Sequence, residues 1–362
     1  MRFFGKEFSK DDLRRKIGDL SQVAGIKPYV LEDGYAQGVK ALDIKTGSGF
    51  YFTVLPGRAL DIAWMEHNGR SAGFIGKGGI THSSYYGAYG YEWLRSFYAG
   101  ILTTCGLINA GPPEKEGIWD LGQHGRISNT PATEVSHSTR WENDELIMTV
   151  KGCMRETSIF YENLTLTRTI TAKGGENKLT IHDEVKNEGF ESIDFMLLYH
   201  ANVGFPVVDE GSIFLAPIVN TRGRDEEADK GLESFKSFEK PTPGYKEQVF
   251  FHKLAEDEQG LTFAGIINEQ MEIGFYLRYN QKELPHLTEW KMMGQQDYVV
   301  GIEPGNCLPI GRKASKEKGW LDKLDPGSSK SFTIEMGMMT TWEEIEWFKG
   351  YKDVLLKGRK KV

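Results

Sequence analysis

The sequence has 362 residues, of which 39% are hydrophobic and 26% are charged, and its formal net charge is −7. A chain of this length can bury a large core, and the composition is ordinary for a globular protein. The negative charge argues against a nucleic-acid partner, which usually requires a basic stripe. Because no long apolar run and no secretory signal is present, we expect a cytoplasmic protein without a membrane partner.

The three cysteines give no sign of a disulfide framework or a zinc site. Cys105, Cys153 and Cys307 are widely spaced and odd in number. They therefore predict neither crosslinks nor a structural metal.

The chain begins with one predicted helix and continues as strands. Residues 8–20 predict a short helix with Ser9 as its N-cap, so residues 1–25 are expected to form a helical N-terminal extension. Strands are then expected at 39–45, 50–55 and 59–66, separated by turn residues such as Asn68-Gly69.

The middle of the chain gives the clearest pattern. Residues 164–171 and 178–187 alternate between polar and apolar side chains on either side of a glycine turn, which predicts a hairpin with one buried face. Residues 193–205 are apolar on both faces and predict a strand between two covered layers.

The rest of the chain predicts more strands, one long connection and a C-terminal helix. The expected strands are 212–216, 248–253, 261–267, 271–279, 298–303 and 331–339. The charged residues 221–247 predict a long surface connection, with or without a short helix, and 341–357 predict a C-terminal helix or a pair of short turns. Since neither a repeat nor a composition break occurs, we expect one antiparallel sandwich domain over residues 1–362.

Two ionisable residues end buried strands. His200 ends the apolar run 193–200 and is followed by Asn202, a position where a core histidine is more common than a catalyst. Glu303 ends the run 298–303, where an unpaired carboxylate would be costly. Glu303 could pair with Arg312 or Lys291, or it could face a ligand in open space left by Gly301 on the same strand face.

Other residues suit ligand contacts, although each also has an ordinary structural interpretation. His124 lies between glycines and beside Arg126, and Arg58 follows a Pro-Gly turn with a guanidinium suited to bidentate contacts. Three tryptophans are candidate platforms for a sugar or simply core residues, namely Trp93, Trp119 and Trp290.

Four segments, in this order, resemble the aldose 1-epimerase (galactose mutarotase-like) superfamily. They are GRALDIAWMEHNGR (57–70), HGRISN (124–129), the hairpin and strand of 164–205, and VVGIEPGN (299–306). The resemblance implies an all-β fold, a large antiparallel β-supersandwich with a short N-terminal helix and a helical C-terminus. It also implies anomer interconversion of a small-molecule carbohydrate without a metal or other cofactor.

The resemblance also implies site residues. His200 matches the general acid, Glu303 the general base, His124 a second sugar-binding histidine, and Arg58 a substrate-binding arginine. Further candidate substrate contacts are Arg126, Asn202 and Lys291. The family's acidic hydroxyl-binding residue has no clear match, so the chain resembles a divergent branch whose sugar does not carry over.

This pair suits ring opening of a sugar. One group removes the proton of the C1 hydroxyl and another protonates the ring oxygen, and histidine and glutamate can do both near neutral pH. The oligomeric state leaves no trace in the sequence, and a homodimer is expected only as the commonest assembly.

Three alternatives remain open. A metal-dependent sugar isomerase or lyase could use His124, His200 and Glu303 as ligands. A glycosidase would need a second carboxylate beside Glu303, such as Asp61, Asp194 or Asp209. A non-catalytic carbohydrate-binding protein would need aromatic platforms but not both His200 and Glu303.

Overall fold

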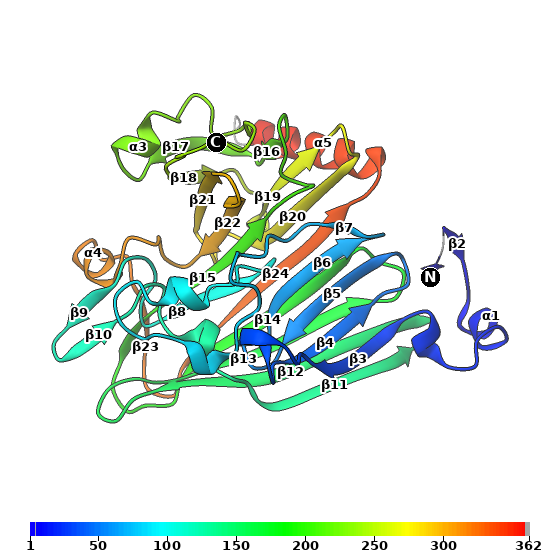
Figure 1. Cartoon of the computed structure of the whole chain (residues 1–362), viewed down its shortest axis with the longest axis horizontal. Coiled ribbons are helices and arrows are strands. Elements are labelled where there is room, and N and C mark those ends of the chain that lie inside the picture. The colour runs from blue at the N-terminus through cyan, green and yellow to red at the C-terminus, as the bar shows by residue number, and fades with distance from the viewer. Residues whose placement is uncertain (4, 359–362) are drawn as a thin grey trace.

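Figure 1 shows a computed structural model of the chain, which describes residues 1–3 and 5–358. Most strands lie in three antiparallel sheets whose apolar faces meet in one large hydrophobic core. The predicted all-β architecture is therefore confirmed. The expectation of one domain over residues 1–362 stays a prediction.

The largest sheet extends across the molecule, from β11 at the bottom of Figure 1 to β16 near its top. Its strands, in spatial order, are β11 (Thr133–Glu142), β12 (Glu145–Thr157), β13 (Asn163–Lys173), β14 (Lys178–Asn187), β24 (Ser329–Met339), β20 (Ile273–Asn280), β19 (Leu261–Asn268) and β16 (Ile213–Leu215). β13 and β14 are the predicted hairpin, and buried residues alternate along most of its length. One face of this hairpin therefore lies in the core, as expected for strands whose side chains point to alternate faces.

The second sheet carries the residues of most interest. Its strands are β17 (Ile218–Gly223), β18 (Gln248–Leu254), β21 (His286–Met293), β22 (Tyr298–Gly305), β15 (Ile193–Val203) and β23 (Asp322–Leu324), with β8 (Thr103–Leu107) also paired to β15. Every residue of β22 is buried, as are nearly all of β15. The prediction that β15 lies between covered layers is confirmed.

A third sheet and two small hairpins complete the strands. The third sheet contains β3 (Gly25–Val30), β4 (Lys40–Lys45), β5 (Phe50–Leu55), β6 (Asp61–His67) and β7 (Arg70–Ser71). The hairpins are β1 (Arg2–Phe3) with β2 (Lys6–Glu7), and β9 (Glu114–Glu116) with β10 (Trp119–Leu121).

The helices are mostly short. They are α1 (Lys10–Arg14), α2 (Trp93–Ser96), α3 (Glu226–Asp229), α4 (Arg312–Glu317) and α5 (Trp342–Gly358). α5 confirms the predicted C-terminal helix and buries Ile345, Phe348 and Leu355 against the outer side of the largest sheet. None of the described helices combines the length and apolar character needed to span a membrane.

The predicted N-terminal helix is shorter than expected. Ser9 is its N-cap, with a capping box to Asp12, but the helix ends at Arg14 instead of residue 20. Gly18 and Asp19 follow, and the Asp19 side chain accepts a hydrogen bond from the Ser21 amide to start a separate 3₁₀ turn. Local side-chain hydrogen bonding therefore competes with continuation of the helix.

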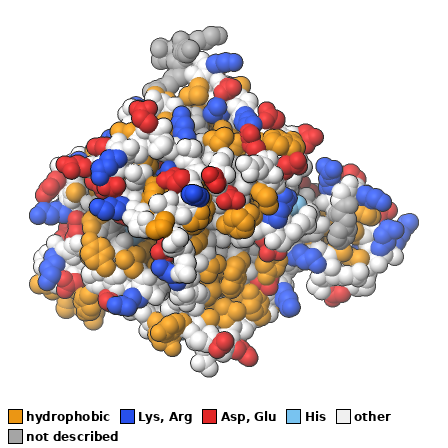
Figure 2. All heavy atoms as spheres, turned by 45° about the horizontal axis from the view of Figure 1, so that its top comes forward, with side chains coloured by type: hydrophobic (Ala, Val, Ile, Leu, Met, Phe, Trp, Pro, Cys, Tyr) orange, Lys and Arg blue, Asp and Glu red, His pale blue; other side chains and the backbone are white. Residues whose placement is uncertain are grey.

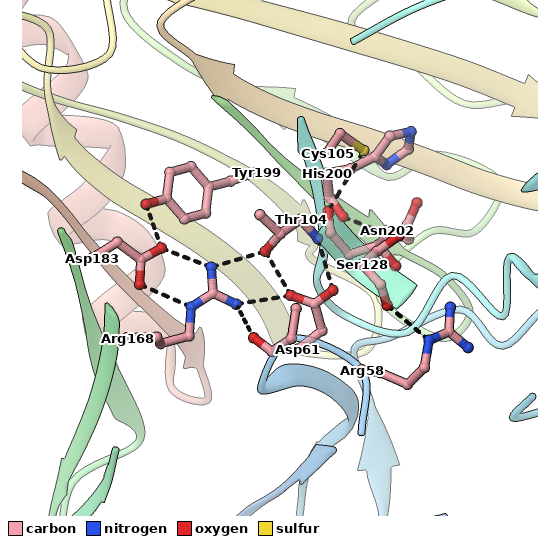
Figure 3. Close-up of polar contacts among 12 residues, drawn as sticks. Arg58, Asp61, Thr104, Cys105, Ser128, Arg168, Asp183, Tyr199, His200 and Asn202 are labelled. Atoms are coloured by element: carbon pink, nitrogen blue, oxygen red, sulfur yellow. Dashed lines mark hydrogen bonds and ion pairs between the residues drawn. The ribbon is translucent and has the colours of Figure 1, made fainter. Parts of the chain in front are cut away.

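A buried ion network joins the three sheets beneath β15. Arg168 of β13 pairs with Asp61 of β6 at 2.8 Å and with Asp183 of β14 at 2.7 Å, and all three side chains are fully buried. Thr104 of β8 donates to Asp61, and Tyr199 of β15 donates to Asp183 (Figure 3). Every member of the network is hydrogen-bonded, and the two buried carboxyl groups share the single guanidinium of Arg168.

The outer surface has mixed charge. Figure 2 shows Lys and Arg side chains interspersed with Asp and Glu side chains across one face of the molecule. Apolar side chains also gather in patches between the charges, mainly in the lower half of this view, and the Lys and Arg side chains do not form a stripe on this face.

Candidate functional site

Strand register brings His200 and Glu303 together. β15 and β22 are antiparallel neighbours, and Leu198 pairs with Gly305 while Ala201 pairs with Ile302. The same register sets His200 opposite Glu303, so both side chains lie on one face of the sheet. Nε2 of His200 lies 3.1 Å from Oε1 of Glu303, and the two side chains are 6% and 2% exposed.

Gly301 makes this contact possible, but not by leaving open space. A Cβ atom added at Gly301 would lie 2.5 Å from Oε1 of Glu303, 3.1 Å from Cβ of Trp290 and 3.2 Å from Cε1 of His200. The expected gap for a sugar ring is thus wrong, because the Glu303 carboxylate and its neighbours fill it. Glycine at this position lets the carboxylate fold back toward the imidazole.

Both residues line a cavity of about 910 Å³, which we call the His–Glu cavity. The lining also comes from residues 74, 76–78, 91, 93–95, 97, 111–112, 123–124, 224, 247, 249, 290, 292, 297, 299 and 309–310. Trp93 and Trp290, two of the three predicted platforms, are part of the lining. Trp119 lies elsewhere and stacks on Tyr161. The cavity size is in the range of small-molecule sites.

Burial controls the protonation of the pair. Loss of solvation raises the pKa of Glu303 to about 8 and lowers the pKa of His200 to about 3. Burial thus favours the uncharged form of each group. The pair therefore holds one proton at neutral pH, and a carboxylic acid hydrogen-bonded to a neutral imidazole is the favoured arrangement.

His124 lies in the same cavity, as the sequence predicted. Its ring is 5.8 Å from that of His200 and 4.8 Å from that of Trp93, measured between centroids. The Gly111 amide donates to Nδ1 of His124, so Nε2 carries the proton of the neutral ring. Burial lowers the pKa of His124 to about 4, which makes it a neutral hydrogen-bond donor at physiological pH.

The structure does not bring the predicted arginines into this cavity. Arg58 is buried, and its guanidinium donates to the carbonyls of Ser128, Thr81 and Ser96. It borders a separate hollow of about 670 Å³. Arg126 is exposed and is not part of the His–Glu cavity lining.

Asn202 and Lys291 are also outside the cavity lining. The amide of Asn202 donates to the carbonyls of Gly100 and His200, which ties down the strand that carries His200. Lys291 is buried; its ammonium donates to the Ser237 carbonyl and pairs with Glu239 at 2.8 Å. Both are placed to hold the backbone around the site.

The alternative partners for Glu303 are occupied elsewhere. Lys291 is bound to Glu239, and Arg312 pairs with Glu116 at 2.7 Å. Asp61, a candidate second carboxylate for a glycosidase, is held by Arg168. Within residues 1–3 and 5–358, no group of three or more His, Cys, Asp or Glu side chains is arranged to hold a metal ion.

A family model matches residues 36–338, and its description is "Domain of unknown function (DUF4432)". The chain belongs to the DUF4432 family. The matched region contains His124, and it contains His200 and Glu303 together with the strands β15 and β22 that carry them. No curated protein matches this chain at a significant level.

Solved structures share the fold of this DUF4432 chain. A candidate aldose 1-epimerase from Klebsiella pneumoniae has a TM-score of 0.88 at 24% identity, with 96% of this chain and 91% of that chain covered. A galactose mutarotase-like protein from Clostridium acetobutylicum has a TM-score of 0.63 at 15% identity, with 88% and 100% covered. A galactose 1-epimerase from Lactobacillus acidophilus has a TM-score of 0.57 at 12% identity, with 88% and 99% covered.

These likenesses confirm the predicted galactose mutarotase-like fold. The match to a family of unknown function agrees with the expected divergent branch. At these identities the likeness concerns the fold alone, and the activity of the DUF4432 chain is a separate question.

Arg224 and Glu247 are among the charged cavity residues that sequence reasoning missed. Arg224 and Glu247 belong to the segment 221–247, which was expected to be only a surface connection. The charged composition of that segment hid them among ordinary solvated side chains. The signal that could have revealed Glu247 was its position immediately before the predicted strand β18.

Proposed function

We propose that this protein is an aldose 1-epimerase-like isomerase that interconverts the α and β anomers of a sugar. The observation that carries the proposal is the 3.1 Å contact between His200 and Glu303 at the wall of the His–Glu cavity. A base and an acid that differ in chemistry and share one proton suit a reaction that removes one proton and delivers another.

The reaction needs both groups close to a single carbon atom. The C1 hydroxyl oxygen and the ring oxygen are bonded to the same carbon, so two side chains in contact can reach both. Glu303 takes the hydroxyl proton as the C1–O bond to the ring breaks, and His200 protonates the ring oxygen. The open aldehyde turns about its C1–C2 bond, and the reverse transfers close the ring on the other face.

The protonation state that burial favours for Glu303 and His200 is the one that follows ring opening. Ring opening by an ionised Glu303 and a protonated His200 leaves a neutral acid and a neutral imidazole, the arrangement that burial favours. Before opening, the proton passes from Glu303 to His200 across their contact, and a bound sugar's hydroxyls help to solvate the resulting charges. His124 offers a neutral N–H donor to a sugar oxygen beside the pair.

The aromatic lining supports a carbohydrate as the ligand. Trp93 stacks on Phe97 with centroids 4.3 Å apart, and Phe97 and Trp290 each lie 5.5 Å from the His200 ring. Aromatic faces pack against the C–H faces of a sugar, while the polar groups at the end of the cavity suit its hydroxyls.

Anomer exchange measured by NMR tests the proposal. The panel should contain neutral aldoses, uronic acids and phosphorylated aldoses, each with and without the protein. We expect exchange of at least one sugar to accelerate well above its spontaneous rate. Binding of a sugar without acceleration would instead favour the non-catalytic carbohydrate-binding alternative and overturn the proposal.

A further inference from the structure

An ion pair between Arg224 and Glu247 lies at one wall of the His–Glu cavity, beside the strand β21. Nη2 of Arg224 lies 3.0 Å from Oε1 of Glu247, and Nε1 of Trp290 donates to Oε2 of Glu247 at 2.9 Å. Both carboxylate oxygens of Glu247 are thus engaged. Nε of Arg224 also pairs with Asp225 at 2.7 Å, and Asp225 caps α3. The charges therefore have a fixed orientation.

Trp290 links this ion pair to the His–Glu contact. Trp290 pairs with Gly301 across β21 and β22, which places it on the same face as Glu303. Its indole reaches outward to Glu247, while its ring lies 5.5 Å from the His200 ring between centroids. Glu247 and Arg224 line the same cavity as Glu303.

The two charges act on Glu303 in opposite directions. The Glu247 carboxylate helps to raise the pKa of Glu303, whereas the Arg224 guanidinium opposes that rise. Burial is the larger cause, and the ion pair adjusts it. Because Arg224 and Glu247 are 34% and 48% exposed, solvent and salt weaken their fields but do not remove them.

We propose that the Arg224–Glu247 ion pair, oriented by the Trp290 indole, is a positioning pair that tunes Glu303 for proton transfer. The inference deepens the proposed function and rests on it. Neither residue is required to exchange a proton with the sugar. Their role is to set the field at the carboxyl that does.

Other charged and titratable groups also lie around Glu303. His200 contacts it from β15, His124 lies beyond His200, and Cys105 on β8 is buried nearby. Lys77 and Asp297 line the same cavity and form their own ion pair at 2.8 Å. Arg95, also in the lining, pairs with Glu92.

Titration of the Glu303 carboxyl tests the inference without any need for activity. The full-length protein carries glutamate labelled with ¹³C at the carboxyl, and Glu303→Gln identifies the signal. We expect Glu247→Gln to move the Glu303 midpoint to lower pH and Arg224→Gln to move it to higher pH. Each shift should be at least about 0.5 pH units, less than the 1–3 units caused by a charge in direct contact.

Two further variants serve as controls for the titration of Glu303. The double variant Arg224→Gln/Glu247→Gln should return the midpoint toward the wild-type value, because the opposing charges are removed together. Lys77→Gln/Asp297→Asn is the matched control, since it removes another ion pair of the same cavity and should leave the midpoint in place. Equal midpoints in all variants, or shifts of the two single variants in the same direction, would overturn the inference.

Rates add a second readout. For any sugar that the wild type interconverts, the pH at which the rate changes should move in the same direction as the Glu303 midpoint. Added salt should shrink both shifts. Absence of anomer exchange with opposite titration shifts would count against the proposed function alone, whereas normal exchange without the shifts would count against the positioning pair alone.

Discussion

Tyr199 and His200 are adjacent on β15, and their side chains point to opposite faces of the sheet. The Tyr199 hydroxyl donates to Asp183 at 2.7 Å in the buried ion network, while His200 contacts Glu303 at 3.1 Å on the cavity side. Figure 3 shows the two rings diverging from the strand. One strand thus connects the buried ion network to the candidate site.

The ion network should therefore contribute strongly to stability. Arg168→Met would leave Asp61 and Asp183 as buried carboxylates without a cation, and we expect a loss of about 3–5 kcal/mol in the free energy of unfolding. Urea unfolding measures this. Lys173→Gln is the control, because Lys173 on the same strand pairs with Glu145 at the surface and should cost at most about 1 kcal/mol. Equal losses in both variants would contradict the argument.

Gly301→Ala should separate activity from stability. The new methyl group would overlap the end of the flexible Glu303 side chain, which then moves away and loses its contact with His200, while Trp290 and His200 give way only slightly. We expect anomer exchange to fall by at least about 10²-fold, the value of one positioned proton transfer, while the free energy of unfolding changes little.

Gly350→Ala provides the comparison for this variant. Gly350 lies in α5 with open space around its Cβ position, so alanine there should leave exchange unchanged and slightly stabilise the helix. Wild-type exchange in Gly301→Ala would show that the His200–Glu303 contact is not needed.

The buried pair also predicts how stability depends on pH. Folding raises the pKa of Glu303 from 4.5 to about 8, so the folded state binds this proton more tightly and the free energy of unfolding falls as pH rises through that window. Folding lowers the pKa of His200 from 6.5 to about 3, so this group makes the free energy of unfolding rise between pH 3 and 6.5. Between pH 6.5 and 8 the Glu303 effect stands without opposition from His200.

Urea unfolding at several pH values between 6.5 and 8 checks this expectation. The free energy of unfolding of the wild type should fall more steeply across that range than that of Glu303→Gln, which has no proton to lose. Glu258→Gln, which changes an exposed carboxyl, should follow the wild type. Parallel curves for Glu303→Gln and the wild type would rule out a carboxyl held protonated by burial.

Arg58 is predicted to act through structure. Arg58→Lys keeps the charge but cannot reach three carbonyls in different directions, so we expect a loss of about 1.5–3 kcal/mol in the free energy of unfolding. At temperatures where the variant is folded, the Michaelis constant for a converted sugar should stay at the wild-type value. A raised Michaelis constant with unchanged stability would return Arg58 to the role of a substrate contact.

Local patterns in the sequence predicted the elements with strong periodicity. The hairpin of β13 and β14, the doubly covered strand β15 and the helix α5 follow from alternation or helical spacing. Several strands were missed, among them β3, β8, β11, β12, β17 and β21. β21 carries the charged residues Glu289 and Lys291, whose burial depends on partners distant in sequence. Such tertiary pairing overrides local composition.

Three of the candidate site residues that the sequence singled out lie together, but their geometry was not predictable from it. His200, Glu303 and His124 were recognised from strand ends, glycines and family resemblance, and they share one cavity. The register that sets His200 opposite Glu303 depends on pairing between strands about a hundred residues apart, which one sequence does not reveal. Arg58 and Lys291 were singled out for their charge, but backbone carbonyls and Glu239 occupy these side chains in the fold.

The most direct test of the His200–Glu303 pair is a double-mutant cycle on the rate of anomer exchange. The wild type, His200→Gln, Glu303→Gln and the double variant are compared by NMR on the sugar that the wild type converts fastest, with folding checked by circular dichroism. We predict that each single change lowers the rate by about 10²–10⁴-fold and that the double change costs little more than the larger single one. Folded single variants that exchange anomers at the wild-type rate would contradict the account.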